Sequence, residues 1–192
     1  MEKKRLIVGI SGASGAPLAI ACLQELRAHP EIETYLIVTH GGEVTLAQET
    51  GLLPEQVCAL ADCVCDNADI GAGPASGTFR TAGMLIVPCS MKTAAGICSG
   101  YSDNLLLRAA DVTLKEQRTL VLAARESPLS AIHLRNLCQL AALPGVHIIP
   151  PMVSYYHHPH TLEDLNRHIT ARLLEPFGIE MKGYCRWTDQ FV

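Results

Sequence analysis

Five short, largely apolar runs recur along the chain, with polar and mixed segments between them. They cover residues 6–10, 34–39, 84–87, 120–124 and 146–149. Continuous apolar runs of this length are typical of strands that are buried on both faces of a parallel sheet. We therefore predict five parallel strands, in this order along the chain.

The segments between the runs show helical spacing. We expect helices over residues 18–28, 43–49, 103–116 and 129–142, a short helix from Pro54, and a last helix marked by Leu162, Leu165, Ile169 and Leu173. Residues 67–83 are rich in small residues and predict a long loop, which in a compact domain is often functional. Strands alternating with helices predict an open parallel sheet with helices on both faces. The expected fold is a three-layer α/β fold of the Rossmann-like or flavodoxin-like kind. We expect one domain over residues 1–192, with a C-terminal helix and tail over about 161–192.

Composition narrows the class of protein. The 192 residues are 48% hydrophobic and 18% charged, with a formal net charge of −4, which argues against a nucleic-acid-binding protein. No apolar run approaches the roughly 18 residues of a membrane helix, and we identify no signal peptide. We therefore expect a cytoplasmic protein. The eight cysteines lack metal-ligand spacing, so we expect reduced thiols, with Cys89 set apart by its place at a strand end.

Two polar loops follow predicted strands. The first, Gly12 to Gly15, stands between a strand and a helix, where small residues let a phosphate approach backbone amides at a helix N-terminus. Its spacing from Gly9 is G-x-x-G-x-x-G rather than the dinucleotide fingerprint, which favours a mononucleotide or another anion over NAD. The second loop, Ser90 to Thr93, offers two hydroxyls and a cation. The alternatives are a tight packing turn for the first loop and a helix N-cap with a solvated lysine for the second.

Charged residues end the run at 120–124. A charged pair such as Arg125-Glu126 at the end of an apolar strand is expected to be partly desolvated. Desolvation of charges costs free energy, so such a pair indicates a functional role. With Arg108 and Lys115 nearby in sequence, the pair predicts an anion site that contains an acid/base group. The alternative for Arg108, Lys115 and Arg118 is a solvated basic helix face.

The histidine-rich turn at residues 155–160, YYHHPH, raises a metal hypothesis. Adjacent histidines on an extended chain point to opposite sides, and no acidic ligand stands in register with them, so we expect no metal site. A hydroxyl of Tyr156 that donates to a bound phosphate fits this turn better. Arg172, on the last predicted helix, is suited to a bidentate phosphate contact, and its alternative is a surface arginine.

Taken together, these segments resemble the UbiX family of flavin prenyltransferases over nearly the whole chain. The segments that match are GISGASGA, residues 39–49, PCSMKT, RAADVTLKEQR, RESPLSAIHLRN, the YYHHP turn, Ala171-Arg172 and Arg186-Trp187. The GASGAP pattern, with Pro17, is similar to the B subunits that accompany hydroxyaryl-acid decarboxylases. Among these segments, RAADV-LKE and RE-PL--IHL are the most specific.

The resemblance implies a cytoplasmic transferase that joins the dimethylallyl group of dimethylallyl phosphate to N5 and C6 of reduced FMN. The prenylated FMN would serve a UbiD-type aromatic acid decarboxylase, and the chain would form a dodecamer with sites at subunit interfaces. The residues implied for FMN are Gly12, Ala13, Ser14, Thr39, Ser90, Met91, Lys92, Thr93 and Arg125. Those implied for the prenyl phosphate are Lys115, Tyr156 and Arg172, some of them from a neighbouring subunit. Glu49, Glu126 and Lys115 are the implied catalytic residues. Neither a metal nor a membrane nor a nucleic acid is implied.

Three other functions remain as alternatives. A flavin-dependent cysteine decarboxylase would carry a PASANT-like loop, of which Pro74-Ala75-Ser76-Gly77-Thr78 is only a partial echo. A non-catalytic subunit that stores FMN for a decarboxylase would need no leaving-group site. Direct decarboxylation of an aromatic acid has no support in the sequence beyond the flavin site. Whether phosphate or Glu126 takes the C6 proton stays open, as does the choice between dimethylallyl phosphate and pyrophosphate.

Overall fold

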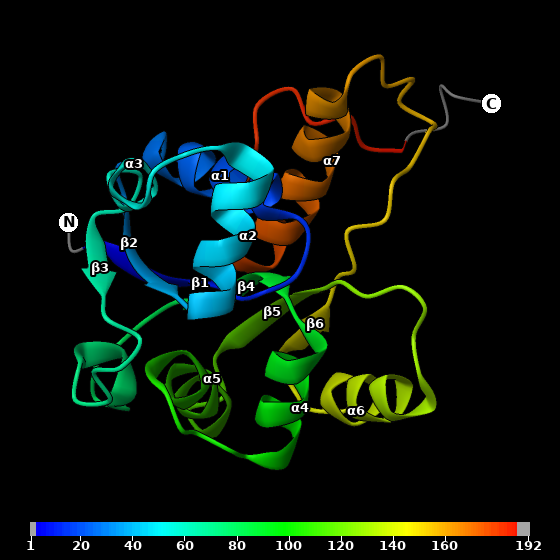
Figure 1. Ribbon diagram of the computed structural model, residues 1–192. Helices are drawn as coiled ribbons and strands as arrows, with labels where there is room; N and C mark the ends of the chain where they lie inside the picture. The colour runs from blue at the N-terminus through cyan, green and yellow to red at the C-terminus, as the bar shows by residue number, and fades with distance from the viewer. Residues whose placement is uncertain (1–2, 188–192) are drawn as a thin grey trace.

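The computed structural model describes residues 3–187 and contains one six-stranded parallel sheet (Figure 1). The strands are β1 (Lys4–Ile10), β2 (Ile32–Val38), β3 (Cys63–Cys65), β4 (Gly83–Cys89), β5 (Thr119–Ala124) and β6 (Val146–Ile148). Their order across the sheet is β3-β2-β1-β4-β5-β6, which is the order of a doubly wound Rossmann fold. The predicted three-layer α/β fold is confirmed.

Helices cover both faces of the sheet. One face carries α1 (Ala16–Arg27), α2 (His40–Thr50), α3 (Pro54–Cys58) and α7 (Leu162–Leu174), and the other carries α4 (Met91–Ser99), α5 (Leu105–Lys115) and α6 (Ala131–Ala141) (Figure 1). Short 3-10 turns lie at Gly73–Ala75 and Glu175–Phe177. None of the helices within residues 3–187 is long and apolar enough to span a membrane.

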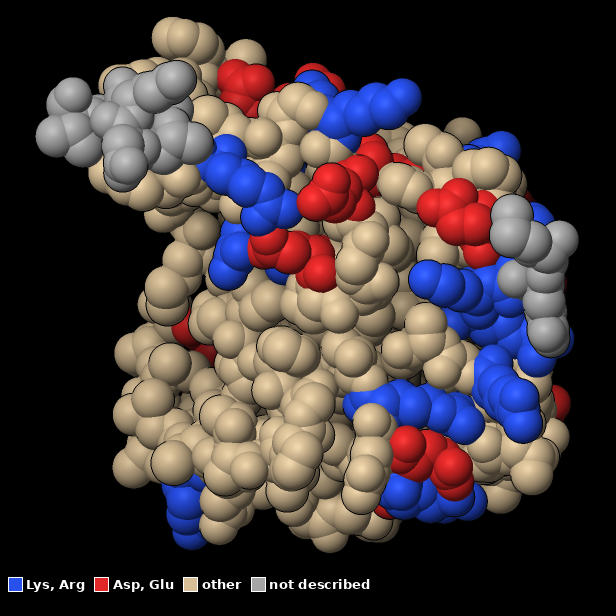
Figure 2. Space-filling model, turned by 180° about the vertical axis from the view of Figure 1, so that it is seen from behind, with Lys and Arg blue, Asp and Glu red and all other residues tan. Residues whose placement is uncertain are grey.

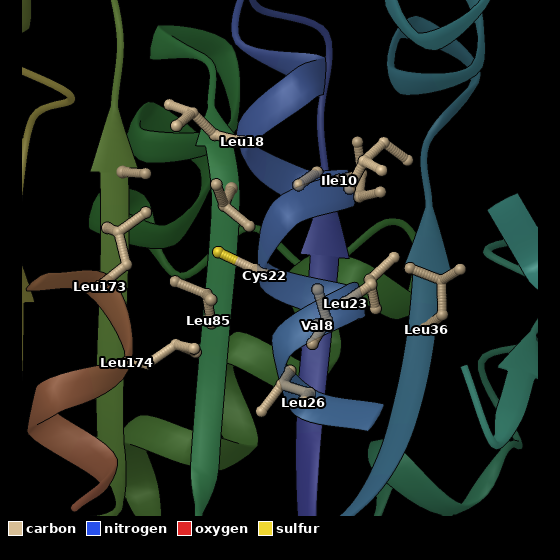
Figure 3. Packing of buried hydrophobic residues seen from close by; sticks show 14 of the residues in the cluster. Val8, Ile10, Leu18, Cys22, Leu23, Leu26, Leu36, Leu85, Leu173 and Leu174 are labelled. Atoms are coloured by element: carbon tan, nitrogen blue, oxygen red, sulfur yellow. The ribbon is translucent and has the colours of Figure 1, made fainter. Parts of the chain in front are cut away.

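The sheet separates two hydrophobic cores, and this explains the continuous apolar runs. Successive strand residues point to opposite faces, so Val8 and Leu85 pack in one core while Ile7 and Met84 pack in the other. In the first core, Cys22, Leu23 and Leu26 of α1 lie over the strands beside Leu173 and Leu174 of α7 (Figure 3). A strand that contacts both cores needs apolar residues at every position, and β4 is buried throughout.

Besides α4, for which the sequence offered only a helix start at Ser90 and no range, two elements differ from the sequence-based expectation. Strand β3 was not predicted, because it has only three residues and pairs only with β2, and its central Val64 is half exposed. Its position is held by Asp62, whose Oδ2 accepts from the Thr34 amide at 2.8 Å and from the Thr34 hydroxyl at 2.9 Å. The second difference is that Thr39 is the N-cap of α2 rather than the end of a strand.

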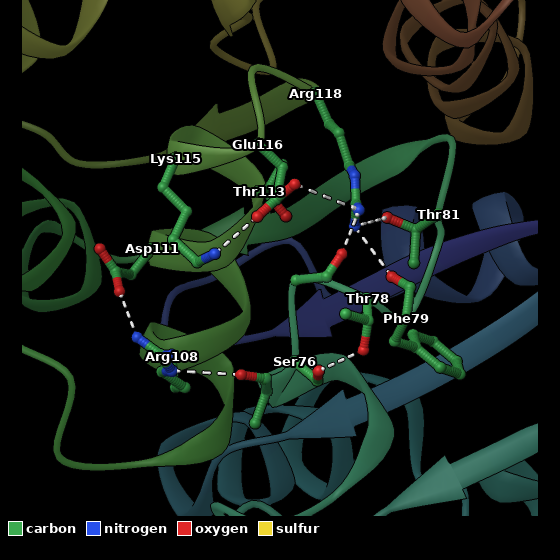
Figure 4. Close-up of polar contacts among 12 residues, drawn as sticks. Ser76, Thr78, Phe79, Thr81, Arg108, Asp111, Thr113, Lys115, Glu116 and Arg118 are labelled. Atoms are coloured by element: carbon green, nitrogen blue, oxygen red, sulfur yellow. Dashed lines mark hydrogen bonds and ion pairs between the residues drawn. The ribbon is translucent and has the colours of Figure 1, made fainter.

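The loop over residues 66–82 is anchored by arginines from the α5 region (Figure 4). The Arg118 guanidinium donates to the Phe79 carbonyl at 2.9 Å and to the Gly77 carbonyl at 2.7 Å, and the Arg108 Nε donates to the Ala75 carbonyl at 3.3 Å. Arg118 lies beyond the end of α5 and its side chain is largely buried. The alternative of a solvated basic helix face is therefore wrong for Arg118.

Candidate functional site at the carboxyl edge of the sheet

The loops after β1 and β4 meet where the strand order reverses, which is where open α/β sheets bind ligands. Ser11 joins them. Its side chain is 1% exposed, its hydroxyl donates to the Pro88 carbonyl at 3.0 Å, and its oxygen accepts from the Ser90 amide at 2.8 Å. Sequence reasoning missed Ser11; the available signal was a serine directly after an apolar strand. The two predicted polar loops are therefore parts of one edge.

The loop after β1 exposes its backbone on one side and packs through Gly12 against the backbone of Gly41 on the other. A Cβ atom placed on Gly12 would lie 2.9 Å from the Cα of Gly41, so the loop and the start of α2 touch backbone to backbone. Gly12 and Ser14 are exposed and Ala13 is half-buried. Backbone polar groups at such a surface can reach a ligand without obstruction by long side chains.

Glu49 of α2 already occupies the first turn of α1. Its Oε2 accepts from the Gly15 amide at 2.9 Å and from the Ala16 amide at 2.8 Å. Partial burial raises the pKa of this carboxyl, but hydrogen bonds from Ser14, Gly15 and Ala16 and the charge of Arg125 outweigh it, so the pKa lies below its usual value. Phosphate binding by this loop stays a prediction. It would have to use groups other than the Gly15 and Ala16 amides, which Glu49 already occupies.

Thr39 connects the second strand to the same edge. As N-cap of α2 its Oγ1 accepts from the Gly42 amide at 3.1 Å, and the hydroxyl lies 3.3 Å from the Ile10 carbonyl, to which it donates. Gly42 is required there, because a Cβ on it would lie 2.6 Å from the Ile10 carbonyl oxygen. Thr39 is half-buried, and its hydroxyl positions the start of α2.

The loop after β4 begins α4 with a neutral cap. The Ser90 Oγ accepts from the Thr93 amide at 3.2 Å and its hydroxyl lies 3.1 Å from the Thr93 Oγ1. Met91 and Thr93 are buried, whereas Lys92 is exposed and Ser90 is half-buried. The N-cap that was weighed as the alternative for this loop is present, and it leaves Ser90 and Lys92 as the side chains of this segment that a ligand can reach.

The thiol of Cys89 is buried beneath this edge. Burial raises its pKa to about 12, so the thiol stays protonated and is a poor nucleophile. Within residues 3–187 all eight cysteines are free.

Arg125 and Glu126 follow β5 and are both exposed. The expectation of a partly desolvated pair is wrong for the single chain, because no other segment among the described residues covers the end of β5. The Arg125 amide donates to the Cys89 carbonyl at 3.1 Å, and the Arg125 charge contributes to the lowered pKa of Glu49. Glu126 accepts from the Ser127 amide at 2.9 Å. Arg125 therefore lies on the same edge as Glu49 and the β4 loop.

Lys115 lies at the opposite edge of the sheet. It ends α5, shortly before β5 begins at Thr119, whereas Arg125 follows the other end of β5. Six strand residues span about 20 Å, so the predicted grouping of Lys115 with Arg125 does not form within one chain. Arg108 is held instead by the Ala75 carbonyl and by an ion pair with Asp111. Lys115 instead pairs with Glu116 at 2.6 Å (Figure 4).

A cavity of about 500 Å³ opens where the chain leaves β6 at the carboxyl edge. Its polar and aromatic lining includes Tyr156, His168, Arg172, Tyr184, Arg186 and Trp187. Glu175 forms ion pairs with both Arg172 and Arg186. Burial, followed by the charge and hydrogen bond of Tyr184, raises the pKa of Tyr156. The cavity thus brings together the predicted site residues Tyr156 and Arg172, and the matching pair Arg186-Trp187, with His168 and Tyr184, which the sequence did not single out.

Sequence reasoning missed His168 because a single histidine on an amphipathic helix carries no distinctive pattern. Its position four residues before Arg172, on the same helix face, was the available signal. Among the described residues no group of three or more histidine, cysteine or acidic side chains is arranged to hold a metal ion.

The chain is similar to flavoproteins over most of its length. The family model described as Flavoprotein matches residues 1–173. A relative from Escherichia coli O157:H7, a probable UbiX-like flavin prenyltransferase, is 50% identical over 183 residues, which cover 95% of this chain and 92% of the relative.

Two solved structures are similar over nearly their full length. A dodecameric FMN-dependent UbiX-like decarboxylase from Escherichia coli O157:H7 is 49% identical, with a TM-score of 0.94, and covers 96% of this chain and 99% of its own. AnUbiX in complex with FMN and dimethylallyl pyrophosphate is 43% identical, with a TM-score of 0.94, and covers 97% of this chain and 98% of its own.

Proposed function

Because the chain belongs to the flavoprotein family and is a flavin prenyltransferase of the UbiX type, we propose that it joins a dimethylallyl group to N5 and C6 of reduced FMN. Dimethylallyl phosphate is the proposed donor, and inorganic phosphate is released. The product, prenylated FMN, serves a UbiD-type aromatic acid decarboxylase. The observation that carries the proposal is that two separate regions on one sheet edge present hydroxyl and cationic side chains: the loops that end β1, β2, β4 and β5, and the cavity beyond β6.

The first region suits FMN. We assign its contacts to Gly12, Ala13, Ser14, Thr39, Ser90, Met91, Lys92, Thr93 and Arg125, with the buried Met91 and Thr93 contributing through backbone groups only. The close packing of Gly12 on Gly41 leaves accessible backbone at this edge, and Arg125 and Lys92 supply exposed positive charge. Backbone amides, hydroxyls and cations are the donor set that a phosphate prefers. Reduced FMN supplies the electron-rich ring that accepts the prenyl group.

The cavity beyond β6 suits the prenyl phosphate. Cleavage of the carbon–oxygen bond builds negative charge on the leaving phosphate, and donors placed at that charge lower the barrier. Tyr156 offers a hydroxyl and Arg172 a guanidinium in the same lining. Glu175 now holds Arg172 by an ion pair, so Arg172 is already oriented before a phosphate arrives.

Two carboxylates are the proposed acid/base groups. Glu126 is exposed at the end of β5 and has its side chain tied only to the adjacent Ser127 amide within residues 3–187. Glu49 is held in its ionised form by the first turn of α1. We assign proton transfer to Glu126 and charge balance to Glu49. Glu126→Gln is then expected to retain FMN and to slow turnover, and an unchanged rate of product formation would remove Glu126 from the reaction.

Assembly completes the site in this proposal. Lys115, the third proposed phosphate ligand, cannot reach the cavity of its own chain, so a second copy must supply it. The surface of α6 supports association: Ile132 and Leu134 are exposed, and Leu140 is its only buried residue among those that the structure describes. Figure 2 shows few charged side chains on the side of the molecule where α6 lies. We propose a dodecamer, as in the UbiX-like relative of known structure.

The two alternative functions, FMN storage and cysteine decarboxylation, explain fewer of the observed site features. A subunit that only stores FMN has no use for the cavity with Tyr156 and Arg172. A cysteine decarboxylase does not fit identities of 43–50% to flavin prenyltransferases and UbiX structures. The eight free cysteines suit a reducing compartment, and we assign the enzyme to the cytoplasm.

The proposed reaction is tested by incubating the protein anaerobically with reduced FMN and dimethylallyl phosphate, followed by mass spectrometry of the released flavin. A mass gain of one five-carbon prenyl unit is expected. A parallel incubation with dimethylallyl pyrophosphate identifies the donor. Bound but unaltered FMN with both donors would contradict the proposal and favour the storage function.

A further inference from the structure

The buried histidine His168 stands beside Tyr156 in the cavity, and nothing in the proposed reaction yet uses it. Its side chain is 7% exposed, and its Nε2 lies 3.3 Å from the Tyr156 hydroxyl oxygen. The inference drawn from this contact rests on the proposed function, because it concerns how Tyr156 presents its hydroxyl to the prenyl phosphate.

The surroundings of His168 favour its neutral form. Its ring stacks on the His157 ring with centroids 4.3 Å apart and an angle of 7° between the planes. Burial, the neighbouring His157 and the charge of Arg172 all lower the pKa of His168. A neutral imidazole carries one proton, on either Nδ1 or Nε2, and so donates from one nitrogen only.

The hydrogen bonds of the cavity distinguish the two tautomers. The Nδ1 of His168 is buried and has no hydrogen-bond partner within residues 3–187. A proton on Nδ1 would therefore be a buried donor without an acceptor, and buried donors without a partner are rarer in proteins than buried acceptors without one. A proton on Nε2 has the Tyr156 oxygen as its acceptor.

The partner of Tyr156 on its other side agrees with this assignment. Tyr184 lines the same cavity, and a hydrogen bond with it raises the pKa of Tyr156. A Tyr156 hydroxyl that donates to Tyr184 leaves its oxygen free to accept from the imidazole. With the His168 proton on Nε2, Tyr156 can accept from the imidazole and donate to Tyr184 at the same time.

We propose that His168 is a positioning residue, whose Nε2–H donates to the Tyr156 oxygen and so directs the Tyr156 O–H toward the prenyl phosphate beside Arg172. His168 touches no reacting atom in this arrangement. It acts through Tyr156, and a phosphate that enters the cavity replaces Tyr184 as the acceptor of the Tyr156 proton.

Steady-state kinetics on substituted proteins test this role. His168→Leu removes the donor and is expected to lower kcat/KM for dimethylallyl phosphate about tenfold, as for the loss of one hydrogen bond, with FMN affinity unchanged. His168→Gln places an amide donor at a similar reach and is expected to restore most of the loss. The matched control is His160→Leu, an exposed histidine of the same segment, which should behave as the unsubstituted protein.

A double substitution separates positioning from packing. In a Tyr156→Phe background, where the hydroxyl is already absent, His168→Leu should lower kcat/KM by less than about twofold. A full additional tenfold loss, or a failure of His168→Gln to restore activity while it folds normally, would overturn the proposal.

The tautomer itself can be measured without turnover. In nitrogen-15 NMR spectra of the assembled protein, His168 is expected to show a protonated Nε2 and an unprotonated Nδ1, and a protonated Nδ1 would overturn the assignment. The outcomes also separate this inference from the proposed function. An unsubstituted protein that makes no prenylated flavin contradicts the function, whereas normal turnover with equal kcat/KM for His168→Leu contradicts only the role of His168.

Discussion

The first turns of α1 and α4 lie at the same edge of the sheet, but their backbone amides are satisfied in different ways. At α1, the Glu49 carboxylate from α2 accepts from the Gly15 and Ala16 amides. At α4, the neutral hydroxyl of Ser90 accepts from the Thr93 amide. A helix N-terminus favours negative charge, and α1 has already received one from within the chain.

Two loops of similar composition are therefore not equivalent anion sites. An added phosphate at the first turn of α1 would meet the like charge of Glu49 and would have to displace it from two amides. The first turn of α4 has a neutral cap, with Lys92 exposed beside it and Arg125 at the end of the neighbouring strand. The α4 side of the edge is thus the more favourable environment for an added anion.

Gly12→Ala is expected to have the largest effect, because it disturbs the backbone contact that supports the α1 side. The new Cβ would lie 2.9 Å from the Gly41 Cα, so the loop and α2 must separate. We expect a loss of about 1–3 kcal/mol in the free energy of unfolding and at least about tenfold weaker FMN binding, measured by urea denaturation and by flavin fluorescence.

Gly71→Ala is the matched control for Gly12→Ala, since its Cβ would meet only the Asp69 carboxylate, at 3.3 Å. It should leave FMN binding unchanged. Equal effects of both substitutions would show that the close approach of Gly12 and Gly41 is not what shapes the site.

Glu49→Gln tests the difference between the two helices directly. It keeps an oxygen acceptor for Gly15 and Ala16 but removes the charge. We expect the free energy of unfolding at pH 7 to fall by at most about 1 kcal/mol, because the exposed side chain is screened by solvent. The folded pKa of Glu49 is lowered below its ordinary value of 4.5. The Glu49 charge therefore stabilises the folded protein fully above pH 4.5, and this stabilisation is lost as the pH falls through the folded pKa.

The measurement for Glu49 is urea denaturation of both proteins between pH 7 and pH 3. The difference in unfolding free energy should shrink as the pH falls. A difference that stays constant down to pH 3 would mean that charge at the α1 N-terminus contributes nothing and that the two helix starts are equivalent.

A feature of the fold or the site was predictable when it depends on residues close together in the sequence, and was missed when it depends on residues far apart. Apolar runs predicted five of the strands because burial on both faces acts on each residue of a strand. The strand Cys63–Cys65 was missed because its pairing with β2, and not its own composition, makes it a strand. The cap of Ser90 was predictable because Thr93 is three residues away.

Long-range contacts at the site were not predictable in the same way. The contact of Glu49 with Ala16 joins residues 33 positions apart, and no local pattern indicates it. Sequence proximity also misled: Lys115 and Arg125 are ten residues apart in the chain, but a strand runs between them and places them at opposite edges. The exposure of Arg125 and Glu126 depends on what covers the end of β5, which a strand pattern does not contain.

Ser90→Ala removes the neutral cap of α4 and is expected to cost about 1 kcal/mol in the free energy of unfolding. Because the Thr93 hydroxyl loses its partner as well, FMN binding should weaken by a few fold. Ser99→Ala, at the other end of the same helix, is the control and should change neither quantity by more than about 0.5 kcal/mol. A loss of stability for Ser99→Ala equal to that for Ser90→Ala would contradict a specific role of the cap.

Thr39→Ser has the smallest expected effect and extends the comparison to the start of α2, the third helix at this edge. Serine keeps the oxygen that accepts from Gly42 and the hydroxyl that donates to Ile10, so unfolding free energy and FMN affinity should change by less than about 0.5 kcal/mol. Thr39→Val keeps the shape but loses the cap, and it should cost about 1 kcal/mol. If serine were as damaging as valine, the Thr39 methyl group rather than its hydroxyl would position α2, and this helix start would depend on packing instead of capping.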